Sequence, residues 1–239
     1  MKKIIYLFLL FAANSYAQSE HLFRNSISVG VGIAKPLGNL AETNIDDTLS
    51  GYGKNGLSLY VGFNRVGKSG LGIYGHFKSS SIGINESELK KDAEAKLNSK
   101  AESFSTDNYS INSINIGLLF VINKNHKFQI VPQFGFGLSA CRNRTINGTF
   151  NSVIPGIKTT WDYKSDKKTS LNFMCGIDFS YKIKDNIALF FKSEWQLQAP
   201  QFKYENKAYV NGVQFGQSDK TYFFPMFIQN NMLGIKVAL

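Results

Sequence analysis

The sequence predicts an all-β fold, an antiparallel up-and-down transmembrane β-barrel of about eight strands with long external loops. Three observations support this prediction. Apolar and polar residues alternate with period two in about eight segments. The connections between these segments alternate between short and long. The composition combines 14% aromatic residues and 21 Gly with only 5 Pro, which favours strands over helices.

The first residues have the pattern of a secretory signal peptide. Lys2 and Lys3 precede an apolar run over residues 4–13, and Ser15 and Ala17 are the small residues of a cleavage site before Gln18. The apolar run is too short to span a bilayer as a helix, although an uncleaved N-terminal anchor is the alternative. We therefore expect a cleaved signal peptide at 1–17 and an outer-membrane β-barrel domain at 18–239.

Eight segments are expected to form the barrel strands, because each sets an apolar face against a face of Gly, Ser, Asn, Gln and a few charges. In chain order they are Ser26–Lys35, Gly56–Val66, Gly70–Ser79, Tyr109–Ile122, Lys127–Arg142, Thr169–Lys182, Ile187–Ala199 and Phe223–Leu239.

Two of these strands carry an irregularity. In the fourth, Tyr109 and Ile111 are out of phase with the apolar residues from Ile114 onward, which predicts a bulge near residues 112–113. In the fifth, Pro132 lies inside the strand, where its missing N–H weakens a ladder of hydrogen bonds.

The lengths of the connections predict a topology. Tight turns follow the second, fourth and sixth strands at residues 67–69, 123–126 and 183–186, whereas long segments follow the first, third, fifth and seventh. In a closed up-and-down barrel every second connection lies at the same end. The short turns and both chain ends are therefore expected at one rim and the long loops at the other, the layout of outer-membrane barrels.

Side-chain volume indicates which face points outward. The apolar face carries many Phe, Ile and Leu side chains, too much bulk for the narrow interior of an eight-stranded barrel. The polar face is rich in small residues that fit such an interior, so we expect apolar-out and polar-in, the membrane pattern. A soluble periplasmic lipocalin-like carrier, with the faces inverted, is an alternative.

The chain resembles the small outer-membrane β-barrel superfamily of the OmpA and OmpX type, and more loosely the porin-family or PorT-family barrels of Bacteroidetes. The resemblance is architectural and covers essentially the whole chain after residue 17. Its most local element is the final strand, residues 231–239, which is similar to the terminal signal read by the barrel-assembly machinery. That signal usually ends in an aromatic residue, whereas this chain ends in Leu239. The resemblance implies a location in the bacterial outer membrane and assembly by that machinery.

Five titratable residues are expected in the barrel lumen, and they are His76, Lys78, Asp178, Lys192 and Glu194. Charges held in a narrow lumen must be paired. We therefore predict that Asp178, Lys192 and Glu194 form a plug of ion pairs and hydrogen bonds. A proton or ion pathway is the alternative.

The sequence offers little for catalysis. Its three His residues, His21, His76 and His126, cannot share a site in this topology, so no metal site and no cofactor are expected. His76 with a nearby Ser could imitate the catalytic pair of a lipid-A-modifying enzyme, but such a pair must meet lipid and His76 is expected to face inward. We predict a non-enzymatic protein, with the lipid-A enzyme as the alternative.

The long loops are the expected functional surface. Residues 86–101 are rich in helix formers and predict a short solvated helix. The third long segment carries basic residues beside aromatic ones, which could contact lipopolysaccharide phosphates or a surface partner; ordinary loop charge is the alternative interpretation. The residues concerned are Arg142, Arg144, Lys158, Trp161, Lys164, Lys167 and Lys168.

Net charge and cysteine content bear on the partners and the covalent structure of the chain. The formal net charge is +10, which raises the question of nucleic acid, but export argues against such a partner. Outer-membrane lipid and lipopolysaccharide are the expected partners. Cys141 and Cys175 are expected on opposite faces and at different heights, so no disulfide is predicted. Together these features predict a role in envelope integrity or surface interaction.

Overall fold

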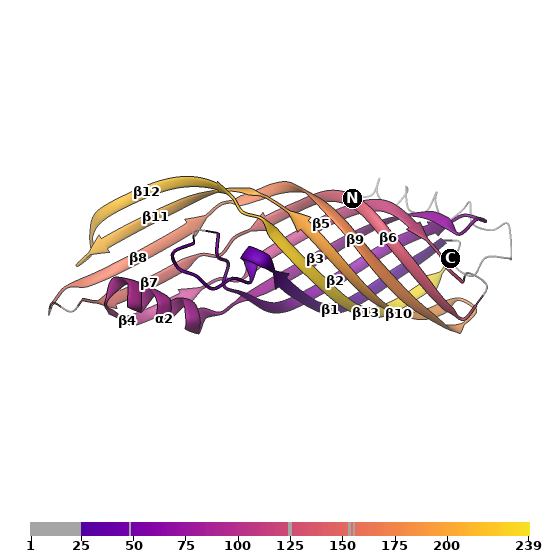
Figure 1. Ribbon diagram of the computed structural model, residues 1–239, viewed down its shortest axis with the longest axis horizontal. Coiled ribbons are helices and arrows are strands. Elements are labelled where there is room, and N and C mark those ends of the chain that lie inside the picture. The colour runs from indigo at the N-terminus through magenta and orange to yellow at the C-terminus, as the bar shows by residue number, and fades with distance from the viewer. Residues whose placement is uncertain (1–24, 48, 124–125, 153, 155) are drawn as a thin grey trace, which may run out of the picture.

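The computed structural model describes residues 25–47, 49–123, 126–152, 154 and 156–239 (Figure 1). The predicted signal peptide therefore lies outside the described residues, as does His21. Eight strands form a closed barrel: β1 (Asn25–Leu37), β2 (Gly53–Val66), β3 (Leu71–Ile84), β5 (Tyr109–Phe120), β6 (Phe128–Arg142), β9 (Lys167–Lys184), β10 (Ile187–Gln198) and β13 (Met226–Ala238).

The barrel order is β1-β13-β10-β9-β6-β5-β3-β2, and every neighbouring pair is antiparallel. The barrel closes where the first and last strands pair, from Ser26 opposite Ala238 to Leu37 opposite Phe227. The predicted fold class and its eight strands are confirmed. Among the described residues, no helix combines the length and the apolar character needed to cross a membrane.

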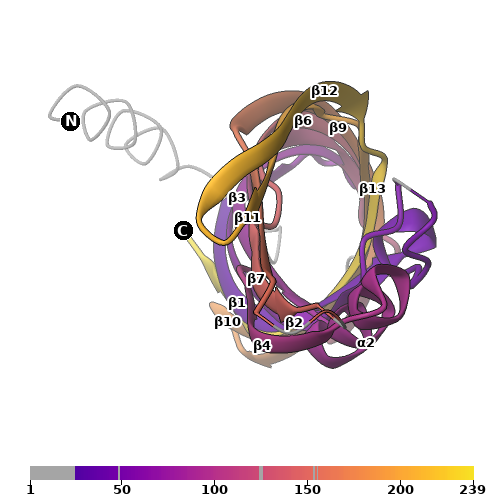
Figure 2. The same ribbon diagram turned by 90° about the vertical axis from the view of Figure 1, so that its left-hand side faces the viewer.

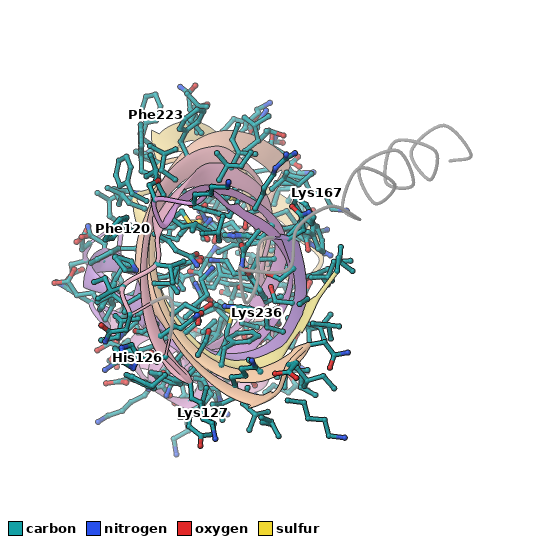
Figure 3. The ribbon with its side chains drawn as sticks, turned by 90° about the vertical axis from the view of Figure 1, so that its right-hand side faces the viewer. Phe120, His126, Lys127, Lys167, Phe223 and Lys236 are labelled. Carbon is teal, nitrogen blue, oxygen red and sulfur yellow. The ribbon has the colours of Figure 1, made fainter. Side chains whose placement is uncertain are left out.

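The apolar face of the barrel points outward. On β5 the alternation is plain, since Ile114 is 65% exposed and Asn115 is fully buried. Figure 3, seen along the barrel, shows Lys236 inside the ring of strands and Phe120 outside it. A soluble carrier requires the opposite arrangement, so the lipocalin-like alternative is wrong.

The short turns lie at one end of the barrel, here called the short-turn end, and the long connections lie at the other, the loop end (Figure 1). Asn25 and Leu239 meet at the short-turn end, where the Leu239 N–H donates to the Asn25 carbonyl over 2.9 Å. The predicted arrangement of turns and loops is confirmed for the described residues.

The long connections are largely folded into a second sheet, which the sequence analysis did not foresee. This loop-end sheet has the order β12-β11-β8-β7-β4. Its strands are β4 (Lys100–Thr106), β7 (Ile146–Asn151), β8 (Lys158–Ser165), β11 (Gln201–Val210) and β12 (Val213–Phe223). The predicted helix is present as α2 (Glu86–Leu97), and a short 3-10 turn, η1 (Gly38–Leu40), follows β1. Figure 2 shows β7 and β11 on one side of the barrel opening and α2 on the other.

The predicted bulge near residues 112–113 is wrong. The pairing of β5 with β3 and with β6 runs through this region without a register shift. Tyr109 and Ile111 point inward because the lumen at the loop end is lined by apolar side chains. Further along the strand Ser113 and Asn115 point inward to a polar lumen. The composition of the inner face changes, and the backbone alternation does not.

Pro132 is accommodated at a gap in the hydrogen-bond ladder. The pairing of β5 with β6 ends at Leu119 opposite Gln133 and resumes only at the isolated bridge between Ile122 and Ile130. Pro132 lies within this gap, where a strand with no N–H to donate loses least.

The two cysteines are free thiols, as predicted. Cys141 is buried at the loop end of β6, and Cys175 is exposed on the outer face of β9.

Candidate functional site

The centre of the lumen is an ion cluster around Glu194. Its carboxylate, on β10, pairs with the ammonium groups of Lys78 on β3 and Lys192 on β10, the latter over 3.0 Å. His76 Nε2 on β3 lies 3.9 Å from Glu194 Oε2 and 3.0 Å from the side-chain amide nitrogen of Asn115. Glu194, Lys78 and Lys192 are at most 1% exposed. The structure thus brings four of the five sequence-predicted lumen residues together.

Aromatic rings enclose this cluster. The Lys192 ammonium lies 4.4 Å from the centroid of the Tyr60 ring and 5.7 Å from that of Tyr74. The Tyr74 ring stacks on His76 with centroids 5.5 Å apart. A cation over an aromatic face is stabilised by the ring quadrupole, more so where water is excluded. Tyr60 and Tyr74 therefore help to compensate the desolvation of Lys192.

Asp178 lies opposite Lys192 in the register of β9 and β10, as a shared plug requires, but its close ion pair is with Lys236. Its Oδ2 lies 3.0 Å from Lys236 Nζ, and its Oδ1 accepts a hydrogen bond from Ser180. Lys236 was absent from the predicted set. Its phase on the last strand is inward, but the registers set Lys236 opposite Ala188 and Asp178 opposite Lys192, so the contact depends on how far the Lys236 side chain extends along the lumen.

Glycines make room for the large lumen side chains. A Cβ added at Gly135 would lie 2.2 Å from the Tyr74 hydroxyl oxygen, and one at Gly117 would lie 2.6 Å from it. The Tyr74 hydroxyl fills this space and donates to the Met174 sulfur over 2.9 Å. The inner face therefore alternates between bare backbone and bulky rings, as a narrow barrel requires.

The buried charges of the lumen are paired with one another. Three ammonium groups and two carboxylates are buried there in close pairs. Two of these pairs, Lys78 with Glu194 and Lys236 with Asp178, link strands that are not neighbours in the ring, and all of them fill the interior. His76 is 4% exposed and faces the lumen, so it cannot meet lipid as the enzyme alternative requires. No group of three or more His, Cys, Asp and Glu side chains in the described part of the chain could hold a metal ion.

An apolar plug closes the loop end of the lumen. Tyr109, Phe202, Met226 and their neighbours are almost fully buried in one cluster that joins the barrel to the loop-end sheet. The Tyr109 hydroxyl donates to the Gly51 carbonyl over 2.8 Å and so ties the first long connection to this plug. The plug separates the polar lumen from the space enclosed by the loop-end sheet.

Two of the seven predicted surface-binding residues face inward. Arg144 donates to the carbonyl oxygens of Gly51 and Ser50 over 2.8 and 3.0 Å, with its guanidinium 5.4 Å from the Tyr52 ring centroid. Trp161 on β8 donates its indole N–H to the Asn206 side-chain oxygen. Both residues are half-buried on the inner side of the loop-end sheet.

The other five residues lie on the outside, and four of them have carboxylate partners close by. The pairs are Arg142 with Asp107 at 3.4 Å, Lys158 with Glu102 at 2.7 Å, Lys164 with Asp162 at 2.9 Å, and Lys168 with Asp166 at 2.9 Å. Lys167 is exposed and forms no ion pair within the described residues. Exposed pairs of this kind are weak and exchange readily with other partners.

Tyrosines on the inner side of the loop-end sheet are shielded from water. Tyr163 on β8 and Tyr204 on β11 stack with centroids 5.3 Å apart. Burial raises the pKa of both phenols well above the usual range, and the neighbouring Arg144 only partly offsets this. Tyr204 was not among the residues predicted from the sequence. The available signal is spacing, since Trp161 and Tyr163, like Phe202 and Tyr204, lie two residues apart as on one face of a strand.

Comparison with known proteins places these features in a family. The sequence model of the outer membrane protein beta-barrel domain matches residues 4–221. No curated protein matches the chain.

Solved structures with a similar fold come from several bacteria. A major outer membrane protein from Thermus thermophilus is 12% identical, with 89% of this chain and 98% of that chain covered and a TM-score of 0.47. OprG from Pseudomonas aeruginosa is 12% identical, with 91% and 98% covered and a TM-score of 0.46. Ail, the attachment invasion locus protein of Yersinia pestis, is 13% identical, with 89% and 96% covered and a TM-score of 0.42.

Proposed function

The chain belongs to the outer membrane protein beta-barrel domain family, and from that premise we propose that it is a non-enzymatic surface-interaction protein. The barrel is its anchor in the outer membrane, and the loop end is its working part on the outside of the cell. Lipopolysaccharide is the proposed partner. Envelope integrity then depends on this contact and not on transport or catalysis.

The observation that carries the proposal is the loop-end sheet. Five strands and α2 extend the molecule beyond the barrel as an ordered body, supported on the apolar plug. A barrel with no role outside the membrane does not need a folded structure beyond its rim. Binding residues are often held in this way, on segments positioned by a rigid scaffold.

The filled lumen supports the same proposal, because it argues against a diffusion pore. Lys78, Lys192 and Glu194 occupy the middle of the barrel, and the plug around Tyr109 covers its loop end. In planar lipid bilayers we expect the inserted protein to give no steady conductance. A stable open channel would contradict the proposal.

The test of surface interaction uses a trimmed barrel. Gln198 on β10 lies opposite Met226 on β13, so a short Gly-Ser turn can replace residues 201–223 without disturbing the ladder of the barrel. We expect the trimmed protein to remain in carbonate-washed membranes and to migrate faster on gels when unboiled, as a closed barrel does. In nanodiscs it should bind purified lipopolysaccharide far less than the full chain does.

A charge variant and its control sharpen this test. Lys167→Gln removes an exposed charge at the loop end, and we expect it to weaken lipopolysaccharide binding at low salt. Lys127→Gln removes the same charge at the short-turn end, which Figure 3 views, and should leave binding unchanged. Equal binding by the full chain and the trimmed barrel would overturn the proposal.

Export by a cleaved signal peptide is part of the proposal. The pattern of Lys2, Lys3, the apolar run and Ala17 supports it. Mass spectrometry of protein taken from the outer membrane should give a chain that begins at Gln18. A chain that retains residues 1–17 would overturn this part alone.

A further inference from the structure

A pocket of about 210 Å³ lies on the inner side of the loop-end sheet. It is bounded on one side by β8, β11 and β12 and on the other by α2 and the connection between β1 and β2. Figure 2 looks into this end of the molecule. The pocket is separate from the ion cluster of the lumen, and its lining has a definite chemical character.

Aromatic side chains form one wall of the pocket. Trp161 and Tyr163 come from β8, Tyr204 from β11 and Tyr222 from β12. The ring centroids are 6.4 Å apart from Trp161 to Tyr163, 5.3 Å from Tyr163 to Tyr204, and 5.9 Å from Tyr204 to Tyr222. Three neighbouring strands thus present one continuous aromatic surface, which suits a ligand with a flat or ring-shaped apolar face.

Two cations line the same pocket without a carboxylate partner. Arg144 bonds only to neutral backbone carbonyls, and within the described residues neither it nor Lys220 has a carboxylate oxygen closer than 4.0 Å. The pocket has one acidic residue, Asp47, whose Oδ1 already accepts a hydrogen bond from the Leu49 N–H. A half-buried guanidinium without an opposite charge favours an anion and disfavours a cation, even beside aromatic rings.

Polar groups at the pocket can serve a hydroxyl-rich ligand. Asn44 and Asn206 use their side-chain oxygens as acceptors, Asn44 for the Asp46 N–H and Asn206 for Trp161. Their NH₂ groups have no partner in the described part of the chain, and Ser218 also lines the pocket. A plain aromatic acid has no use for these donors, whereas the ring hydroxyls of a sugar can accept from them.

We propose that this pocket binds an anionic sugar, a sugar ring that carries a carboxylate. The ring lies against Trp161, Tyr204 and Tyr222, the carboxylate pairs with Lys220 and Arg144, and the amides of Asn44 and Asn206 meet the hydroxyls. The inference rests on the proposed function, since it places binding at the loop end. The apolar plug beneath forms the floor of the pocket, which is therefore not the mouth of a channel.

The experiment uses the full chain refolded in detergent micelles, with Trp195→Phe in the background so that Trp161, the other of the two tryptophans, reports alone. The probes are glucuronate, neutral glucose and benzoate. We expect a saturable change in Trp161 fluorescence with glucuronate and binding at least about tenfold weaker with glucose, because glucose lacks the charge. Benzoate should also bind more weakly than glucuronate, because it lacks the hydroxyls.

Variants identify the site. Lys220→Gln, on a side chain with no ion pair to lose, should weaken glucuronate binding about tenfold, and Tyr222→Leu should also weaken it. Lys127→Gln removes the same charge at the short-turn end, far from the pocket, and should leave the affinity unchanged. The unboiled gel shift checks that each variant is folded.

The inference would be overturned by no saturable change with glucuronate, by equal binding of glucose, or by unchanged affinity in Lys220→Gln. Binding of benzoate in preference to glucuronate would replace the sugar by an aromatic acid and so also overturn it. Lipopolysaccharide binding by the nanodisc-held protein is measured in parallel. If the full chain binds lipopolysaccharide but not glucuronate, only this inference is wrong. If the trimmed barrel binds lipopolysaccharide as well as the full chain does, the proposed function is wrong.

Discussion

Lys236 on β13 holds its ammonium nitrogen 3.0 Å from Oδ2 of Asp178 on β9, although β10 separates the two strands. Both side chains are at most 4% exposed. The pair therefore spans three strands on the lumen side of the barrel. Its contribution to stability can be measured.

Replacing Lys236 by Met should destabilise the folded barrel by about 3–5 kcal/mol, because Asp178 then stays buried without its ion-pair partner. The double variant Lys236→Met with Asp178→Asn should recover much of that loss. Urea unfolding in lipid vesicles, followed by tryptophan fluorescence, gives the free energies of unfolding. Additive effects of the two substitutions would show that the pair is not coupled.

The Glu194 cluster allows a direct comparison of buried and exposed carboxylates. Glu194→Gln leaves the ammonium groups of Lys78 and Lys192 without a counter-charge and should cost several kcal/mol, about 3–5. Glu102→Gln is the same chemical change in an exposed pair with Lys158, and it should cost less than about 1 kcal/mol. Similar unfolding midpoints for the two variants would contradict the structural role given to the lumen cluster.

Glycine substitutions test how tightly the lumen is filled. Gly135→Ala introduces a Cβ that meets both the Tyr74 hydroxyl and the Ile116 carbonyl, at 2.2 and 2.4 Å, so about 1–3 kcal/mol of stability should be lost. Gly75 is the matched control, because its nearest neighbours would lie 3.9 Å from an added Cβ. Gly75→Ala should therefore unfold as the unmodified protein does. A harmless Gly135→Ala would mean that the lumen has spare room.

The loop-end tyrosines predict a dependence on alkaline pH. Because burial raises the pKa of Tyr163 and Tyr204, the neutral phenols stabilise the folded state fully below the ordinary tyrosine value of about 10. That stability is lost as the pH rises further toward the folded-state pKa values. Ultraviolet titration should show a late tyrosinate fraction that shrinks in Tyr163→Phe and in Tyr204→Phe. If the variants instead lose tyrosinate signal that appears near the ordinary pKa of about 10, Tyr163 and Tyr204 are not shielded from water.

The barrel could be predicted from sequence because its signal is local. Period two fixes the face on which every strand residue lies, so His76, Lys78, Asp178, Lys192 and Glu194 could all be assigned to the lumen side. The height of a side chain along the barrel axis, in contrast, is not determined by the local sequence. Whether Asp178 meets Lys192 or Lys236 depends on the stagger of β9, β10 and β13 and on how far each side chain extends. For that reason the partner of Asp178 could not be found from the sequence.

The loop-end sheet escaped prediction for a different reason. Its strands are short, and many of the residues on their outer face are charged. On β8, for example, Asp162 lies between Trp161 and Tyr163, and Lys164 follows Tyr163. This composition resembles that of a solvated loop. The alternating aromatic residues were the available signal, but they identify a sheet only when β8, β11 and β12 are known to be neighbours. The pocket that they enclose was equally hidden.

The pairing of β1 with β13 has a consequence for the order in which the molecule is made. Every other barrel ladder joins strands that follow one another around the ring in chain order, whereas this one joins Ser26 to Ala238 across the length of the domain. Contacts so distant in sequence form slowly, since the chain between them must first be ordered. An assembling chain therefore keeps two unpaired strand edges open until its last strand arrives. During that interval it must be shielded from other chains, and a defect in β13 would prolong the exposure.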